Sequence, residues 1–225
     1  TGEITIDKAL TIAGPGAGQM AVSGNNADRI FKSSPSAAVT IQGLSLRDGQ
    51  GGVNGYGGAI YARGVLALTD VSVFGNTARY GGAIYAEGVL TLTNASVFSN
   101  TANVNGGAVY LYNSDGLTAV DTRFIGNTSH GDDGYGNGAG AIYADYGEII
   151  LIDSLFQGNQ ALGASTNAGA LYTYDYAVTI TNTDFLSNTA TDSYGAIFVE
   201  AWHETPVTTI AGGRFQGNQA AAGNA

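Results

Sequence analysis

Residues 56–77 of the chain read YGGAIYARGVLALTDVSVFGNT, and residues 80–101 read YGGAIYAEGVLTLTNASVFSNT, with the same length and few changes. Two anchors from this pair return until the end of the chain. The first anchor, Gly-Ala-aliphatic-aromatic, occupies residues 58–61, 82–85, 107–110, 140–143, 169–172 and 195–198. Its alanines are 24, 25, 33, 29 and 26 residues apart, so the anchors keep register while insertions fall between them.

The segments between the anchors alternate apolar and polar residues. Val89–Thr93 reads VLTLT and Val178–Thr181 reads VTIT, the period-two pattern of half-buried strands. Gly, Asn and Asp separate these segments, as turns require. Each repeat therefore predicts three short strands and no helix, which makes the chain all-β.

Three short strands cannot bury an apolar face alone, but stacked repeats can. We expect a single right-handed parallel β-helix of about eight coils with three strands in each coil. At ~4.8 Å per coil the rod is on the order of 40 Å long. A β-propeller is disfavoured because its blades need about 40 residues and four strands.

Strand parity predicts which side chains face inward. One position in the first strand of each repeat is always aliphatic, at Ile60, Ile84, Val109, Ile142, Leu171 and Ile197. The second anchor supplies an asparagine at a corner of each coil, at Asn76, Asn100, Asn127, Asn159, Asn188 and Asn218. We interpret these asparagines as a structural ladder whose amides hydrogen-bond from coil to coil.

The paired GGAI and FxxN motifs resemble the repeats of polymorphic outer-membrane protein passengers and of bacterial extracellular β-helix proteins. Residues 10–17, LTIAGPGA, and 22–27, VSGNNA, resemble the lead-in coil of the second group. We therefore divide the single domain, residues 1–225, into lead-in coils at 1–55, repeats at 56–218 and an uncapped tail at 219–225. The resemblance implies an exported or cell-surface protein that serves as an adhesin or scaffold.

Composition narrows the function classes. The net charge of -10 argues against nucleic acid and anionic membranes, since both select basic surfaces. The chain has no Cys, so its stability must come from the repeated core rather than from disulfides. No apolar run reaches membrane-spanning length, so we expect no direct membrane insertion. Because the chain begins at Thr1, we expect a processed or partial chain.

An outward aromatic face is the strongest candidate for a binding site. Parity places one aromatic row outside the first strand, and other aromatic residues lie just beyond it. The candidate binding residues are Tyr61, Tyr85, Tyr110, Tyr112, Tyr143, Tyr172, Tyr174 and Trp202. Such a row suits a glycan or a protein partner. The alternative is a structural ladder of stacked rings.

Parallel β-helices also host polysaccharide lyases and glycoside hydrolases, which need paired carboxylates. Asp121 and Asp153 occupy matching corner positions, but Asn94 and Asn182 occupy the same position in neighbouring repeats. This pattern favours turn capping, and we expect no catalytic residues and no enzyme. A third alternative is a structural subunit that associates with itself or joins a larger extracellular assembly through open strand edges.

The sequence also contains candidate residues for a calcium site and for an ice-binding face. Asp132, Asp133 and Asn137 lie in a Gly-rich insertion and are a weak candidate for calcium, against the alternative of a solvated acidic loop. No other cofactor is expected. Thr91, Thr93, Thr179 and Thr181 suggest an ice-binding array, but Ile150 and Ile152 interrupt it. The sequence thus predicts a non-enzymatic surface β-helix, an adhesin or spacer with a tyrosine-rich contact face.

Overall fold

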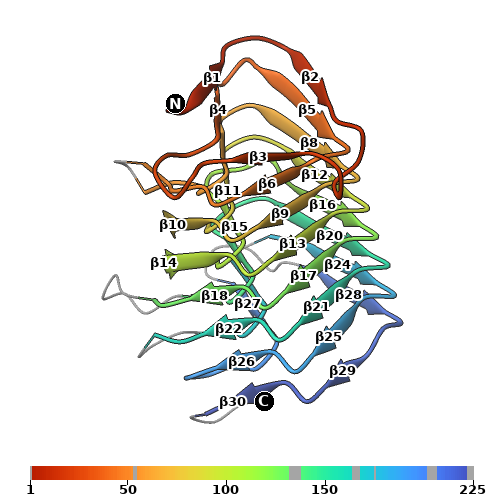
Figure 1. The fold of residues 1–225 in the computed structure, drawn as a ribbon. Helices are drawn as coiled ribbons and strands as arrows, with labels where there is room; N and C mark the ends of the chain where they lie inside the picture. Colours follow the sequence, from red (N-terminus) through yellow and green to blue (C-terminus); the bar gives the residue numbers. More distant parts are fainter. Residues whose placement is uncertain are drawn as a thin grey trace.

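The computed structural model describes residues 2–52, 55–131, 138–163, 168–174, 176–201 and 207–221. These residues form thirty short strands and no helix. Each strand pairs in parallel with the equivalent strand one coil away; Ile84, for example, lies between Ile60 and Val109. The chain winds downward as a right-handed solenoid from its N-terminus to its C-terminus (Figure 1). The predicted parallel β-helix is confirmed.

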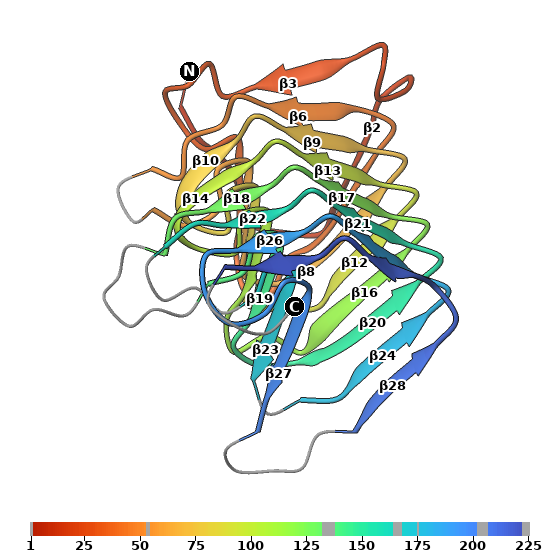
Figure 2. The same cartoon turned by 90° about the horizontal axis from the view of Figure 1, so that it is seen from below.

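The strands form four sheets that run along the solenoid (Figures 1 and 2). Sheet A contains β1 (Ile4–Ile6), β4 (Phe31–Ser33), β7 (Ile60–Ala62), β11 (Ile84–Ala86), β15 (Val109–Leu111), β19 (Ile142–Ala144), β23 (Leu171–Tyr174) and β27 (Ile197–Glu200). Sheet B contains β2 (Leu10–Ala13), β5 (Ala38–Gln42), β8 (Val65–Thr69), β12 (Leu90–Thr93), β16 (Gly116–Val120), β20 (Glu148–Ile152), β24 (Val178–Thr181) and β28 (Thr208–Ala211). Sheet C contains β3 (Ala21–Ser23), β6 (Ser45–Arg47), β9 (Ser72–Phe74), β13 (Ser96–Phe98), β17 (Arg123–Ile125), β21 (Leu155–Gln157), β25 (Asp184–Leu186) and β29 (Phe215–Gln216). Sheet D contains β10 (Thr77–Tyr80), β14 (Thr101–Asn105), β18 (Thr128–Ser129), β22 (Gln160–Ala161), β26 (Thr189–Ala190) and β30 (Gln219–Ala220).

Sheet D corrects the expectation of three strands in each coil. The eight strands in each of sheets A, B and C agree with about eight coils, but six coils carry a fourth strand. These strands begin directly after the ladder asparagines and several are only two residues long, such as Gln160–Ala161. Two residues cannot display an alternating pattern, so hydrophobic periodicity could not reveal them.

The core consists of apolar columns that run from coil to coil. Ile60, Ile84 and Ile142 are all buried in sheet A, as parity predicts. In sheet C the rings of Phe124 and Phe156 are stacked with centroids 4.6 Å apart, and the ring of Phe185 continues the column 4.7 Å from that of Phe156. Because the columns fill the interior, the side chains available for function lie on the outer faces and at the corners.

Candidate functional site

The ladder asparagines form a continuous hydrogen-bonded column inside one corner of the solenoid. Asn127 illustrates the pattern and is fully buried. Its Oδ1 accepts from the backbone N and the Nδ2 of Asn100, at 3.1 and 3.0 Å. Its Nδ2 donates to the carbonyl of Val97 and to Oδ1 of Asn159, at 2.9 and 3.0 Å. Every polar atom of the amide is therefore used to join three coils, which leaves none for a ligand.

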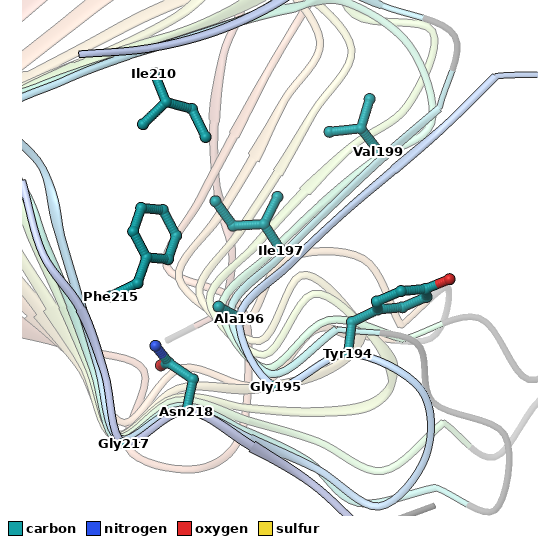
Figure 3. Close-up of a pocket in the computed structure, with 9 residues that line it drawn as sticks. All are labelled: Tyr194, Gly195, Ala196, Ile197, Val199, Ile210, Phe215, Gly217 and Asn218. Carbon is teal, nitrogen blue, oxygen red and sulfur yellow. The ribbon is translucent and has the colours of Figure 1, made fainter. Parts of the chain in front are cut away.

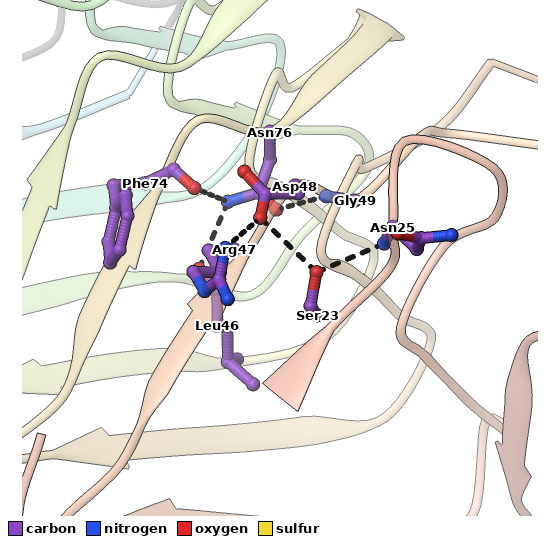
Figure 4. A network of polar contacts seen from close by, with 8 residues as sticks. All are labelled: Ser23, Asn25, Leu46, Arg47, Asp48, Gly49, Phe74 and Asn76. Atoms are coloured by element: carbon purple, nitrogen blue, oxygen red, sulfur yellow. Dashed lines mark hydrogen bonds and ion pairs between the residues drawn. The ribbon is translucent and has the colours of Figure 1, made fainter. Parts of the chain in front are cut away.

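The column begins next to a surface network at the N-terminal side (Figure 4). Asn76 Oδ1 accepts from the backbone N of Gly49 at 2.8 Å, and its Nδ2 donates to the carbonyl of Phe74 at 3.0 Å. Nearby, Asp48 forms an ion pair with Arg47 and accepts a hydrogen bond from Ser23 Oγ at 3.2 Å. This network ties the lead-in coils to the first ladder residue.

A shorter ladder of hydroxyl groups lies at the next corner, and the sequence analysis missed it. The backbone N of Thr122 donates to Ser154 Oγ at 3.2 Å, and the backbone N of Ser154 donates to Thr183 Oγ1 at 3.2 Å. The signal was present in the sequence, because each hydroxyl residue directly follows a corner Asp or Asn. The role of this ladder is structural, since all three residues are buried.

Most of the predicted aromatic face is buried, which corrects the expectation of an open contact surface. Five phenols outside sheet A, at Tyr61, Tyr85, Tyr110, Tyr143 and Tyr172, are at most 8% exposed. We call these five residues the tyrosine stack. Neighbouring rings from Tyr85 to Tyr172 lie nearly parallel, with centroids 5.2, 5.0 and 4.7 Å apart. The rings do point away from the central core, but they form a second apolar cluster of their own.

The segments that lead from sheet D into sheet A explain this burial. They place Ala139 and Ala168 in the same cluster as the stack, and Tyr56 and Tyr80 pack against it. The ring of Tyr56 lies 4.5 Å from that of Tyr85. Sequence parity shows which side chains leave the core, but it cannot show that a neighbouring segment covers them.

Carboxylates flank the two ends of the tyrosine stack. The phenol of Tyr61 donates to Glu87 Oε1 at 2.5 Å, and the phenol of Tyr172 donates to Glu200. Burial raises the pKa of the Tyr61 phenol to about 12, and the hydrogen bond to Glu87 adds to this shift. Burial also raises the pKa of Tyr172 and of the Asp145 carboxyl above their ordinary values. The phenols of Tyr61 and Tyr172 therefore stay protonated well above neutral pH.

Three other tyrosines remain open to solvent where sheet A turns into sheet B. Tyr112, Tyr146 and Tyr176 are 46, 41 and 39% exposed. The rings of Tyr146 and Tyr176 meet edge to face, with centroids 5.6 Å apart. We call these three residues the tyrosine corner. Of the other predicted contact residues, Tyr174 is half-buried and Trp202 lies outside the described residues.

A polar groove of about 750 Å³ runs where sheet B turns into sheet C. It brings Asp121 and Asp153 together with Arg123 and with the Arg214–Asp184 ion pair. The outward residues of sheet C therefore do gather here, although the sequence suggested no cluster. Asp121 and Asp153 both have φ near 49°, and Asn94 and Asn182 in the same column have φ of 48°. Asp and Asn tolerate this left-handed backbone well, which explains the column without catalysis.

The candidate calcium residues and the candidate ice-binding residues remain to be placed. Asp132, Asp133 and Asn137 lie outside the described residues, and the described ranges contain no group of three His, Asp or Glu side chains able to hold a metal ion. In sheet B, Ile150 pairs with Thr118 and Thr179, so an apolar residue interrupts the outward threonine column as expected.

An apolar pocket of about 570 Å³ lies inside the C-terminal coil (Figure 3). Ile197, Ile210 and Phe215 point into it from sheets A, B and C. Each of these residues continues an apolar column of its sheet, since Phe215 pairs with Phe185 and Ile210 with Ile180. The pocket is therefore a continuation of the core and not a separate small-molecule site.

One stretch of the chain matches a known protein family. Residues 70–87 match the family model described as the Chlamydia polymorphic membrane protein repeat. No curated protein and no solved structure matches significantly. The described residues also contain no helix long and apolar enough to cross a membrane. The matched stretch holds residues 73–76, VFGN, in which Val73 stands where later repeats have the Phe of FxxN, and the GGAI motif that follows them. The match points to a surface-exposed, passenger type of protein. The chain is thus a parallel β-solenoid that carries a repeat of the polymorphic membrane protein type.

Proposed function

We propose that the chain is a non-enzymatic, cell-surface β-solenoid that acts as an adhesive spacer and contacts a glycan through the tyrosine corner. The repeat match supports a surface location. The coil-to-coil hydrogen bonds and apolar columns support a rigid rod, which suits a spacer. The assignment of a glycan as the ligand rests on the tyrosine corner alone.

The exposure of Tyr112, Tyr146 and Tyr176 is the observation that carries the proposal. The same chain buries five other tyrosines, whereas these three stay about two-fifths exposed. Phenol rings offer apolar faces that stack on pyranose rings, and their hydroxyls serve as hydrogen-bond partners. Asp115, on the turn after Tyr112, and Glu148, at the start of β20, are exposed and offer acceptors to sugar hydroxyls. The net charge of -10 favours a neutral glycan over an anionic one.

Retention on neutral polysaccharides tests this function. The wild-type chain and the triple variant Tyr112→Ser, Tyr146→Ser, Tyr176→Ser are passed over cellulose, chitin and starch. Val65→Ser together with Val89→Ser is a matched control, because both valines are exposed near the same edge of sheet B, at 45 and 37%. We expect retention of the wild type and the control but not of the triple variant. Equal retention of all three proteins would overturn the assignment to the tyrosine corner.

A polysaccharide-active enzyme is the second candidate, favoured by the groove that contains Asp121 and Asp153. If the groove cleaved glycans, the soluble fraction of the same incubations would contain shortened chains. That cleavage would disappear in Asp121→Asn and Asp153→Asn variants, since amides cannot act as acids or bases. We expect no cleavage by any of these proteins. Light scattering over a range of concentrations would separate a self-associating subunit from both candidates.

A further inference from the structure

The outer face of sheet B carries two columns of side chains that stand in register from coil to coil. Thr118 pairs with Thr91 on one side and with Ile150 on the other, and Thr179 continues this column beyond Ile150. The second column runs beside the first, two residues further along each strand. Across β12, β16, β20 and β24 we call these eight residues the β-branched array: Thr91, Thr93, Thr118, Val120, Ile150, Ile152, Thr179 and Thr181. All eight are half-buried and alternate with buried core residues.

The array is continuous in its methyl groups, although it is not continuous in its hydroxyl groups. Thr, Val and Ile all branch at Cβ and carry a γ-methyl, and the branching restricts χ1. Ile150 therefore interrupts the outward column of hydroxyls but continues the column of γ-methyl groups. The branch points repeat at ~4.8 Å between coils and at about 6.6 Å between the two columns, since each residue of a strand advances ~3.3 Å.

The two columns that contain the array carry no charge along the whole of sheet B. At the paired positions of its eight strands they consist of Thr, Ala, Val, Ile and one Gln, at residue 42. Charged side chains begin at the margins of the face, with Glu148 at the start of β20 and Asp121 and Asp153 at the corner beyond the strands. An uncharged stripe thus runs along a chain whose net charge is -10.

The size and the neutrality of this stripe select its occupant. Two columns over eight coils cover on the order of 400 Å², about half of the ~800 Å² that each partner contributes to a stable protein interface. A charged polymer or an anionic membrane finds no countercharge on the stripe. A crystal of water, in contrast, offers an uncharged surface that repeats in two directions, as the array does. The ~4.8 Å spacing of the coils is also close to a repeat of the hexagonal ice lattice.

We propose that the β-branched array is an ice-binding face. Its methyl groups hold the adjacent water in an ordered layer, since apolar groups restrict the orientations of first-shell water. The threonine hydroxyls donate to and accept from the same layer. This layer joins the surface of an ice crystal, so the protein adsorbs to the ice and halts growth where it is bound. The contact is non-covalent and does not involve the tyrosine corner, so it is an activity separate from glycan binding.

The solenoid supplies the rigidity that contact with a crystal requires. Leu92, Ala119 and Leu151 alternate with residues of the array along the strands and are fully buried in the core. The restricted χ1 of β-branched side chains leaves little side-chain freedom to be lost on binding. No described segment crosses the outer side of sheet B (Figure 2), so the array is open to a large flat surface.

Incorporation into a slowly grown ice hemisphere tests the proposal, with the protein measured in the ice and in the remaining liquid. The wild type is compared with Thr118→Lys, which places a long charged side chain in the array. Ser72→Lys is the matched control, because Ser72 is half-buried on the outer face of sheet C and pairs with Ser45 and Ser96. A thermal melt verifies folding, and Thr91→Lys repeats the test in another coil if Thr118→Lys does not fold. We expect the wild type and Ser72→Lys to enter the ice and Thr118→Lys to stay in the liquid.

Two further variants separate the methyl groups of the array from its hydroxyls and from the tyrosine corner. Thr118→Val keeps the γ-methyl, and the variant with Ser at residues 112, 146 and 176 leaves the array intact, so both should enter the ice like the wild type. Exclusion of the wild type from the ice, or equal incorporation of the wild type and folded Thr118→Lys, would overturn the proposal. Exclusion of either further variant while it remains folded would also contradict it. None of these results depends on glycan binding, because the experiment contains no glycan.

Discussion

At the scale of single residues, the glycine of the Gly-Ala-aliphatic-aromatic anchor explains why the motif repeats. A Cβ built on Gly140 would lie 2.1 Å from the carbonyl oxygen of Gly169 and 2.6 Å from the backbone N of Gln160. Both neighbours are backbone atoms, one in β22 and one just before β23, so they cannot move without disturbing the pairing of the coils. The equivalent Gly58 and Gly82 meet the next coil at 2.3 and 2.2 Å. Only glycine allows the coils to stack so closely.

Gly140→Ala should therefore destabilise the solenoid by about 3 kcal/mol or more, since overpacking of a rigid site has few ways to relax. Gly18→Ala is the control, because nothing lies within 4 Å of a Cβ at that position. Chemical denaturation of the two variants measures the difference. Equal midpoints would show that coil spacing does not depend on the anchor glycine.

The buried ladder asparagines predict a second large effect. Asn127→Ala leaves the carbonyl of Val97 and the backbone N of Asn100 without their partners. We expect a loss of about 3 kcal/mol in the free energy of unfolding, because buried unsatisfied groups are costly. The exposed Asn103 provides the control, and Asn103→Ala should change stability by about 0.5 kcal/mol or less. A similar small change for both variants would contradict the ladder.

At the scale of elements, the tyrosine stack couples stability to alkaline pH. Burial raises the pKa of Tyr61 to about 12 from its ordinary value of 10.0, and it raises those of Tyr85, Tyr110 and Tyr172 as well. Above pH 10 the unfolded chain can release these protons while the folded chain retains them. The contribution of the stack to stability is thus fully present below pH 10 and is lost as the pH rises towards 12 and beyond.

Unfolding by urea at a series of pH values measures this dependence. The free energy of unfolding of the wild type should fall above pH 10, and it should fall less steeply in Tyr110→Phe, which has one ionisable ring fewer. Phenolate absorbance in the folded protein provides the second reading. If Tyr61, Tyr85, Tyr110 and Tyr172 all ionised near pH 10 without unfolding, the burial of the stack would be refuted.

The sequence predicted the elements of the central core well, because one rule governs them. Aliphatic positions such as Ile84 and Val109 recur at a fixed parity, and both face inward. Sheet D escaped prediction, since strands as short as Thr189–Ala190 show no periodicity. The ladder asparagine directly before each strand of sheet D fixes the register of the chain, and the pairing of these short strands depends on that register.

The same reasoning explains what the sequence could predict of the candidate site. Parity correctly predicted that the side chains of Tyr110 and Tyr143 point away from the central core, but it did not reveal the second apolar cluster that buries them. Tyr112 lies two residues beyond Tyr110 and has the same parity, yet it is exposed because it lies at the turn. Exposure is a property of the folded surface and depends on segments from other coils.

At the scale of the whole molecule, the chain combines a rigid interior with chemically distinct outer surfaces. The two hydrogen-bonded ladders and the apolar columns link each coil to the next, so the rod has no obvious internal hinge among the described coils. The tyrosine corner and the polar groove lie at different corners of this rod. A rigid rod with separate contact surfaces suits a spacer that holds a ligand at a fixed distance.

The central claim is that the exposed tyrosines make the contact and the buried ones support the fold. The most direct test compares retention on neutral polysaccharides for two triple variants. One carries Ser at residues 112, 146 and 176, and the other carries Phe at residues 110, 143 and 172. We predict that the first variant is folded but not retained, and that the second is retained like the wild type. Retention of the first variant, or loss of retention by the second while it remains folded, would contradict the account.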